Sequence, residues 1–342
     1  MNIFSVFASS SYKPLVMSNF QPALTTTMDS LFHHSKDKVV VIMGATGSGK
    51  SKLAIDLATH FPPAEVVNSD KIQMYSGLDI TTNKVTEEEC RGVPHHLLGT
   101  FENPNMNFTA SDFCKQASSA IGSIVKRDGL PIIAGGSNSF IDALVNHTPE
   151  FRFNYECCFL WVDVSLPVLH NSLSRRVDRM IDAGQVDEVR QFFLNAHHQS
   201  DYTRGIRRAI GVPEFDRFLR AEASGADERT KRKLLDTAIA ELKVNNCNLA
   251  IRQVQKIHRL YNMWKRSMHR LDATEVLLKN GCCSPEEAEK VWEDHVFSKS
   301  RRIIQKFLYE ETTHRVASKN NGVISSSSSN SSTPSAMAAV TH

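Results

Sequence analysis

Short apolar runs alternate with longer amphipathic segments through the first half of the chain. Each run is rich in β-branched residues and stops at a glycine or a polar residue, which is typical of strands buried on both faces of a parallel sheet. In the segments between the runs, apolar residues recur at helical spacing. This pattern predicts strands at residues 39–43, 64–68, 131–134 and 159–164, and helices at 50–60, 109–127 and 167–183.

The second half of the chain carries the helical pattern alone. After Gly184 the strands stop, and we expect helices at 186–196, 212–221, 229–265 and 285–309. Strands that alternate with helices indicate an α/β fold whose parallel sheet has helices on both faces. We therefore expect an α/β core at 38–184 and a mainly helical C-terminal extension at 185–316.

The two ends of the chain differ from its middle in composition. Residues 1–37 are rich in Ser and Thr and contain only two acids, Asp29 and Asp37. This composition is typical of an organelle transit peptide, and the alternative is a disordered tail without an address. Residues 317–342 are a Ser/Asn-rich segment that buries too little apolar surface to fold, so we expect a disordered tail there.

Composition and charge exclude several classes of protein. The net charge of +3 is too small to indicate a nucleic-acid binder by itself. The seven cysteines contain no C-x-x-C pair, and their odd number suits neither a disulfide framework nor a zinc site. No apolar run reaches the roughly 18 residues that a membrane span requires. We expect a monomer with free thiols in a reducing compartment.

The firmest motif is the octapeptide at 44–51, which fits the phosphate-binding pattern G-x-x-x-x-G-K-S between a predicted strand and a predicted helix. We expect this P-loop to wrap a diphosphate or triphosphate at the helix N-terminus, with Lys50 adding positive charge and the Ser51 hydroxyl holding Mg²⁺. The fold is therefore expected to resemble that of the P-loop NTPases. The members of the loop are Gly44, Ala45, Thr46, Gly47, Ser48, Gly49, Lys50 and Ser51.

The P-loop alone does not define a reaction. ATPases and GTPases that share it also need a strand ending in an acid that holds Mg²⁺, whereas the third predicted strand here ends in Ala134-Gly135-Gly136. Asp163 could serve, but no switch or sensor pattern follows it. Asp70 follows the second strand at the carboxyl edge of the sheet, where ligands of such sheets bind. It is either a base for a nucleophile aligned with the phosphate-bearing molecule or a capping residue.

Five motifs, taken in order, resemble those of the P-loop isopentenyltransferases, which move a dimethylallyl group onto N6 of adenine. The resemblance spans about residues 39–265 and is closest to the plant adenylate isopentenyltransferases, which catalyse the first step of cytokinin synthesis. The motifs are the P-loop at 44–51, NSDKIQMYSGLDITT at 68–82, PHHLL at 94–98, AGGSNSF at 134–140 and LAIRQ at 249–253.

The resemblance implies roles for individual residues. Asp70 matches the general base that takes a proton from the N6 amine, and Thr46 matches the threonine beside the bridging oxygen of the donor diphosphate. Arg176 matches the arginine that neutralises the leaving pyrophosphate. Arg179 would replace it if the register is shifted by three residues, and Arg252 is a further candidate. For each arginine the alternative is a solvated helix face.

The expected chemistry agrees with these roles. An allylic diphosphate ionises toward a carbocation, so the site needs positive charge on the leaving group and an oriented weak nucleophile. Ser137 and Asn138 belong to the fourth motif, which follows the third predicted strand, and they are further candidates for binding the diphosphate or the nucleotide. His95 and His96 point to opposite sides of an extended chain, so structural or substrate-lining roles are favoured over a metal pair.

The main alternative is the tRNA-modifying branch of the same family. Its members carry a sizeable helical insertion after the Gly-Gly motif, whereas only 22 residues separate Gly136 from Phe159 here. Its eukaryotic members also carry a C-terminal zinc finger, for which Cys282-Cys283 has neither the spacing nor the histidines. We therefore expect dimethylallyl diphosphate and a free adenine nucleotide as substrates. A small-molecule kinase is the alternative of another class, and residues 70–82 are not a kinase signature.

Two features bear on the acceptor and the compartment. Arg204, Arg207 and Arg208 could meet the extra phosphates of ADP or ATP, or else form a solvated helix end. ADP and ATP are the expected acceptors, with AMP as the alternative. If residues 1–37 are a transit peptide, the protein is expected in the plastid, with the mitochondrion or the cytoplasm as alternatives.

Overall fold

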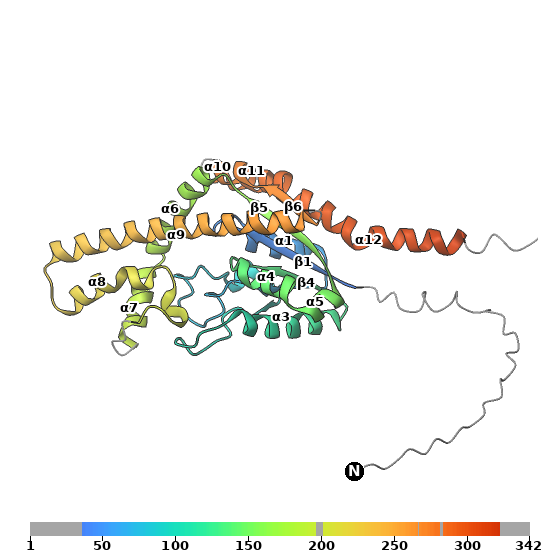
Figure 1. Cartoon of the computed structure of the whole chain (residues 1–342). Coiled ribbons are helices and arrows are strands. Elements are labelled where there is room, and N and C mark those ends of the chain that lie inside the picture. The colour runs from blue at the N-terminus through green and yellow to red at the C-terminus, as the bar shows by residue number, and fades with distance from the viewer. Residues whose placement is uncertain (1–35, 196–200, 266, 281–282, 322–342) are drawn as a thin grey trace, which may run out of the picture. The chain divides into compact units, whose positions relative to one another are not determined.

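The computed structural model describes residues 36–195, 201–265, 267–280 and 283–321 (Figure 1). Apart from Lys36 and Asp37, the expected transit peptide lies outside these residues, as does 322–342 of the expected tail. Helix α12 (Ser298–Asn321) continues into the start of that tail, so the prediction that residues 317–321 lack regular structure was wrong.

The described strands form one six-stranded sheet in which every neighbouring pair is parallel. The order across the sheet is β3-β2-β4-β1-β5-β6, so the strand that leads into the P-loop lies at the centre. The predicted α/β fold class is confirmed. The strands are β1 (Asp37–Gly44), β2 (Ala64–Asn68), β3 (His95–His96), β4 (Leu130–Ala134), β5 (Tyr155–Asp163) and β6 (Met268–Asp272).

The central strands are mainly apolar because both faces of the sheet are covered there. In β1, Val39 and Val41 belong to one buried core, and Val40 and Ile42 belong to the other. Helices α3 (Ala110–Val125), α4 (Asn138–His147) and α9 (Glu228–Trp264) contribute to the first core. The second core contains residues of α1 (Lys50–His60), α6 (Leu166–Asp182), α10 (Thr274–Lys279), α11 (Pro285–Trp292), the π-helical turn η2 (Glu293–Phe297) and α12.

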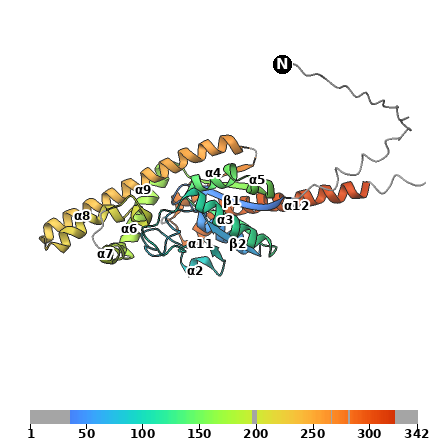
Figure 2. The same ribbon diagram turned by 60° about the horizontal axis from the view of Figure 1, so that its bottom comes forward.

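Helix α9 joins the helical extension to the sheet. It packs against α8 (Val212–Ala223) and α6 and also contacts β1 and α4, and both views show it beside α8 (Figures 1 and 2). Its buried residues recur every three or four positions from Ala238 to Leu260, so a single stripe faces the protein along most of its length. The remaining helices are α2 (Glu87–Cys90), α5 (Pro149–Asn154), α7 (Gln185–Asn195) and the 3₁₀ turn η1 (Gly205–Arg208).

One prediction about the second half was wrong. Strand β6 follows α9 and pairs in parallel with β5 at the edge of the sheet, so strands do not stop after Gly184. Its sequence, Met-His-Arg-Leu-Asp, buries only Met268 and Leu271 and therefore lacks a continuous apolar run. An edge strand is covered less completely than a central one, which allows polar residues within it.

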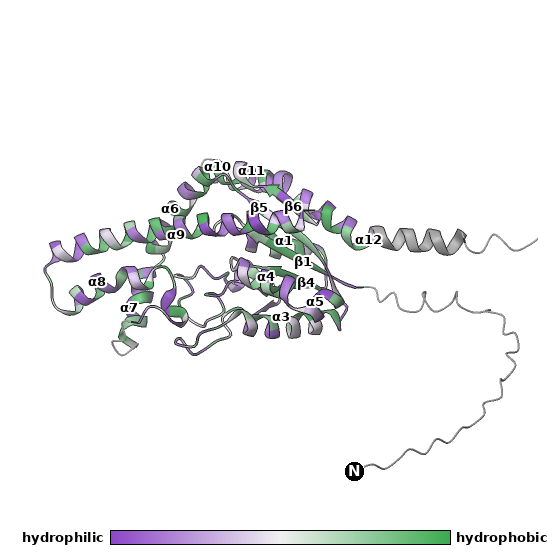
Figure 3. Cartoon of the chain, viewed as in Figure 1, coloured by the Kyte–Doolittle hydropathy of each residue, from purple (hydrophilic) through white to green (hydrophobic). Residues whose placement is uncertain are grey.

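Several shorter elements were also not predicted. Strand β3 contains two residues, and the segment between β4 and β5 forms α4 and α5. The predicted helix at 285–309 is three consecutive helical pieces, α11, η2 and α12. The hydropathy colouring shows the central strands as hydrophobic and α9 as alternating between hydrophobic and hydrophilic (Figure 3). None of the described helices is both long and apolar enough to cross a membrane.

Candidate active site

The P-loop connects the end of β1 to the start of α1. Gly47 and Gly49 have φ angles of 78° and 99°, a left-handed conformation that residues with a Cβ rarely adopt. Within the loop, Lys50 Nζ donates a hydrogen bond to the carbonyl oxygen of Ala45 at 2.7 Å. Burial lowers the pKa of Lys50 to about 8, and the nearby Asp70 partly opposes this shift. The loop therefore holds a buried amine whose charge an anion would stabilise.

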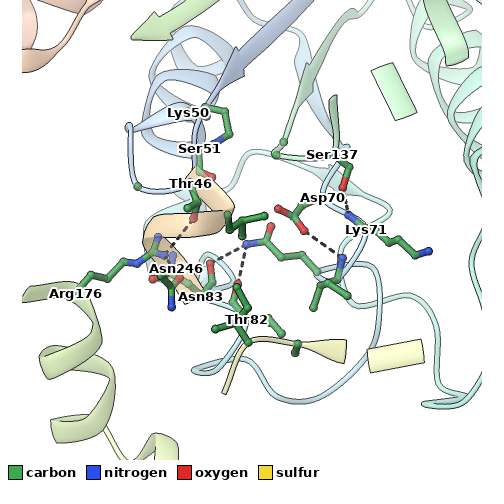
Figure 4. Close-up of a pocket in the computed structure, with 18 of the residues that line it drawn as sticks. Thr46, Lys50, Ser51, Asp70, Lys71, Thr82, Asn83, Ser137, Arg176 and Asn246 are labelled. Carbon is green, nitrogen blue, oxygen red and sulfur yellow. Dashed lines mark hydrogen bonds between the residues drawn. The ribbon is translucent and has the colours of Figure 1, made fainter. Parts of the chain in front are cut away.

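A cavity of about 560 Å³ lies at the carboxyl edge of the sheet (Figure 4). The P-loop and Lys50 form one wall, Asp70 and Gly136 another, and Arg176 of α6 reaches in from a third side. Parallel strands bring the segments after β1, β2 and β4 to this edge, as expected for an α/β sheet. The cavity is therefore the candidate active site.

Asp70 is held by its neighbours in the chain. Its backbone N–H donates to Asn68 Oδ1 at 3.0 Å, and its own Oδ1 accepts the N–H of Ile72 at 3.1 Å. Its Oδ2 has no hydrogen-bond partner among the described residues. A Cβ on Gly136 would lie 2.9 Å from that oxygen, so a larger residue there would require the carboxylate to shift. One carboxylate oxygen is thus fixed by a backbone N–H, and the other borders the cavity without a partner among the described residues.

Arg176 is held against the P-loop threonine. Its Nη2 donates to Thr46 Oγ1 and to Asn246 Oδ1, each at 3.1 Å. Burial and the nearby Arg179 lower the pKa of Arg176 to about 10, and Asp70 raises it. Its Nε is buried and has no partner within the described part of the chain. A buried guanidinium with an unused N–H is what an anionic ligand would satisfy.

The structure brings most of the expected site residues to this cavity. Those that line it are Thr46, Gly47, Gly49, Lys50, Ser51, Asp70, Ser137, Arg176 and Arg252. Gly44, Ala45 and Ser48 lie behind its lining within the loop. Asn138 is also behind it, buried, and donates to the backbone oxygen of Gln253 at 3.3 Å. Arg179 lines two adjoining cavities that it shares with Arg176.

The other singled-out side chains have different surroundings. Arg208 lines the cavity, whereas Arg207 is buried and its Nε donates to Asn105 Oδ1 at 2.8 Å. Arg204 pairs with Asp201 at 3.5 Å. Of the two histidines, His96 Nε2 contacts Glu65 Oε2 at 2.6 Å, and His95 Nδ1 contacts the oxygen of Val93 at 2.8 Å.

Sequence reasoning missed several polar residues of the site. Lys71, Gln73 and Asn246 line the cavity, and Gln253 lies directly behind it. A signal for two of them exists in the sequence, because Asn246 and Gln253 interrupt the otherwise apolar buried stripe of α9. A polar residue in such a stripe needs a partner, and here the partners belong to the site.

The protein oxygens available at the site are suited to Mg²⁺ that is bound together with a diphosphate. Ser51 lines the cavity, and the described residues contain no cluster of three or more His, Cys, Asp or Glu side chains that could hold a metal by themselves. Asp163 pairs with Arg270 at 2.6 Å and is not among the residues that line the cavity. Mg²⁺ is commonly held by one or two protein oxygens plus substrate phosphates, so the Ser51 hydroxyl fits that pattern.

Comparisons with known proteins point in the same direction. The chain is 55% identical over 323 residues, 94% of both chains, to adenylate isopentenyltransferase 5, chloroplastic, of Arabidopsis thaliana. It is 52% identical to adenylate isopentenyltransferase 7, mitochondrial, of the same plant, over 89% of this chain and 90% of the relative. The adenylate isopentenyltransferase of Humulus lupulus is 42% identical over 79% of this chain and 90% of its own.

Solved structures share the fold. A eukaryotic dimethylallyltransferase acting on tRNA superposes with a TM-score of 0.65 at 23% identity, covering 80% of each chain. The tRNA isopentenylpyrophosphate transferase of Staphylococcus epidermidis gives a TM-score of 0.60 at 23% identity, over 79% of this chain and 100% of its own. The family model described as IPP transferase matches residues 73–154 and 146–259. With the P-loop, the opposed carboxylate and these relatives, the chain belongs to the IPP transferase family.

Proposed function

We propose that this protein is an adenylate isopentenyltransferase that transfers the dimethylallyl group of dimethylallyl diphosphate to N6 of an adenine nucleotide, the first step of cytokinin biosynthesis. One observation carries the proposal: the phosphate-binding loop and Asp70 face each other across a single cavity. Relatives named adenylate isopentenyltransferase, up to 55% identical over 94% of the chain, support it.

The P-loop side of the cavity suits the leaving group of the donor. When the bond between C1 of the dimethylallyl group and the diphosphate oxygen breaks, both electrons go to the diphosphate, which gains negative charge. Lys50 and Arg176 are the buried cations on this side, and Arg176 donates a hydrogen bond to Thr46 of the loop. The Ser51 hydroxyl would hold Mg²⁺ on this side, which would supply further positive charge to the leaving group.

The opposite side suits the acceptor. The N6 amine of adenine uses its lone pair to form the new bond to C1, and it must then lose one proton. Asp70 Oδ2 accepts that proton, while Oδ1 remains bonded to the N–H of Ile72. Pyrophosphate leaves from the P-loop side, and the acceptor keeps its own phosphates.

A free nucleotide is favoured over tRNA by the short segment after Gly136. This segment forms α4, α5 and the start of β5, and it holds no inserted helical domain. We further propose that the acceptor is ADP or ATP. Lys71 lines the cavity with Arg208, and burial together with that arginine lowers the pKa of Lys71. Additional acceptor phosphates would relieve the repulsion between these two cations.

The test is a direct comparison of acceptors. Purified protein is incubated with dimethylallyl diphosphate and Mg²⁺, together with AMP, ADP, ATP or unmodified tRNA, and products are identified by mass spectrometry. We expect N6-prenylated ADP and ATP, less prenylated AMP, and no prenylated tRNA. Prenylation of the tRNA alone would overturn the proposal.

The same assay addresses the kinase alternative. A kinase transfers phosphate from ATP without any prenyl donor, so ATP is incubated with Mg²⁺ and candidate acceptors while dimethylallyl diphosphate is left out. We expect ATP to remain intact under these conditions. Loss of the γ-phosphate at a rate comparable with prenyl transfer would favour the kinase.

We also propose that residues 1–37 direct the protein to the plastid. Support comes from the composition of this segment and from relatives whose names include the word chloroplastic. A relative named mitochondrial is also similar, so the mitochondrion is the competing destination. A fusion of residues 1–37 to a fluorescent protein should accumulate in plastids, and mitochondrial or cytoplasmic fluorescence would contradict the proposal.

A further inference from the structure

A single amide side chain connects the two walls of the cavity. Gln253 of α9 is buried, and its Oε1 accepts the backbone N–H of Thr46 at 2.7 Å. Its Nε2 donates to the carbonyl oxygen of Gly136 at 2.9 Å. Thr46 belongs to the P-loop and Gly136 to the loop after β4, which are 90 residues apart in the chain.

The two hydrogen bonds fix the orientation of this amide. An N–H group faces one end of the side chain and a carbonyl oxygen faces the other, so only one placement of the amide oxygen and nitrogen satisfies both. The site is buried, where a polar group left unpaired destabilises the fold. Gln253 therefore acts as a spacer of fixed length and direction between Thr46 and Gly136.

The Gly136 end of this spacer lies beside the proposed base. A Cβ on Gly136 would come within 2.9 Å of Asp70 Oδ2. The next residue, Ser137, accepts the backbone N–H of Lys71 on its Oγ at 2.8 Å and donates its own N–H to the oxygen of Ser69 at 3.1 Å. The loop after β4 is thereby bonded on both sides of Asp70, so a shift of Gly136 would also shift the carboxylate.

At the Thr46 end of the Gln253 spacer, a second amide side chain of α9, that of Asn246, also holds the P-loop. Asn246 lies seven residues before Gln253, which is two helical turns, and its Oδ1 accepts from Arg176. Arg176 in turn donates to Thr46 Oγ1. Helix α9 thus controls Thr46 at its backbone through Gln253 and at its hydroxyl through Asn246 and Arg176.

We propose that Gln253 is a positioning residue that sets the separation between the donor diphosphate and Asp70. This inference rests on the proposed function. Transfer requires the amine and C1 of the donor to meet at close range, and displacements of about 1 Å can cost about a hundredfold in rate. Without the spacer, the loop still binds diphosphate through Lys50, Ser51 and Arg176, but the donor is no longer aligned with the acceptor.

The test compares Gln253→Met with wild type and with the control Gln255→Met, which replaces an exposed glutamine on the same helix. We measure prenylated nucleotide and total pyrophosphate under saturating substrates. In Gln253→Met we expect kcat to fall by about tenfold to a hundredfold. We also expect the ratio of pyrophosphate to prenylated nucleotide to rise at least twofold, because water captures misaligned dimethylallyl cations as dimethylallyl alcohol.

The product ratio separates positioning from loss of folded protein, since misfolding lowers both products in proportion. Binding of inorganic pyrophosphate, measured by calorimetry, should stay within about threefold of wild type because its charged partners remain. Gln253→Glu serves as a second variant: it keeps an acceptor for Thr46 but places an oxygen against that of Gly136, and it should also raise the ratio. An unchanged ratio in both variants would overturn the inference. A wild-type protein that forms no prenylated nucleotide would instead overturn the proposed function.

Discussion

At the scale of single residues, Asp70 gives the sharpest prediction. Asp70→Asn keeps the shape of the side chain and its acceptor for the Ile72 N–H but removes the proposed base. We expect kcat for prenyl transfer to fall by about 10²–10⁴-fold, the usual contribution of a general base. Binding of inorganic pyrophosphate should persist, because Lys50 and Arg176 are untouched.

The matched control for this change is Asp182→Asn, at the exposed end of α6. Single-turnover assays with ADP and calorimetric titration with pyrophosphate check both variants. Full activity of Asp70→Asn would remove Asp70 as the base, and loss of pyrophosphate binding would show that it holds the donor instead.

Lys50 gives a second prediction, in which stability and activity change in opposite directions. Its folded pKa of about 8 lies below the usual lysine value of 10.5. The charged amine therefore destabilises the folded protein at pH 7, by roughly 3 kcal/mol, partly offset by its bond to Ala45. Lys50→Met should thus be more stable than wild type at pH 7 and should not transfer the prenyl group.

The pH dependence of this gain follows from the same shift. Below pH 8 the lysine is charged in both states, so the advantage of Lys50→Met is complete. Between pH 8 and 10.5 the unfolded wild-type chain binds more protons than the folded one, so wild type gains stability and the difference shrinks. Melting temperatures of both proteins from pH 7 to 10 check this, and a difference that grows with pH would contradict it.

At the scale of elements, helix α11 supports the P-loop from behind. The ring of Trp292 lies 3.0 Å from where a Cβ of Gly49 would be, and its Nε1 donates to Asp56 Oδ2 at 2.8 Å. Lys52 lies over the ring, 5.0 Å from its centroid. Trp292→Ala should therefore destabilise the protein by about 3–5 kcal/mol and weaken pyrophosphate binding, because the loop loses its backing.

The control for α11 is Trp264→Ala at the end of α9. Trp264 stacks on Phe159 at 4.4 Å between ring centroids and donates to Asn146 at 3.1 Å, away from the cavity lining. The Trp264→Ala variant should be destabilised about as much as Trp292→Ala, without a change in its affinity for pyrophosphate. Calorimetry under conditions where both variants are folded checks the pair, and equal affinities in the two would show that α11 only stabilises the fold.

The success of sequence reasoning also depends on the element. The P-loop was predicted because its glycines and lysine stand at the fixed spacing of a phosphate-binding loop, and β1 and α1 because their apolar residues follow strand and helix patterns. Strand β6 was missed because an edge strand needs few apolar residues, and only Met268 and Leu271 are buried in it. Gln253 was missed because its neighbour Arg252 carries the charge that sequence reasoning looks for. Whether Arg252 or Gln253 faces the P-loop depends on the rotation of α9 about its axis, which is set by tertiary packing.

At the scale of the whole molecule, the sheet and the helical extension share one core. A continuous buried cluster includes Val41 of β1, Leu242 of α9 and Phe215 of α8. Sequence patterns alone divided the chain at Gly184 because they record local periodicity and not which elements share a core. Since α9 contributes to the extension, the sheet and the site through Gln253, neither part buries its apolar surface without the other.

This shared core predicts that residues 36–321 unfold in one transition. Two probes report on different parts of the protein. Tryptophan fluorescence reports on Trp161 in the sheet, Trp264 where α9 reaches the sheet, and Trp292 on α11. Far-UV circular dichroism is dominated by the helices, including α7, α8 and α9. In urea we expect fluorescence and dichroism to give the same midpoint. Pyrophosphate with Mg²⁺ should move both midpoints upward together, because a ligand that binds only the folded state stabilises all of it. Helical signal that survives after the fluorescence change is complete would show that the extension folds independently of the sheet.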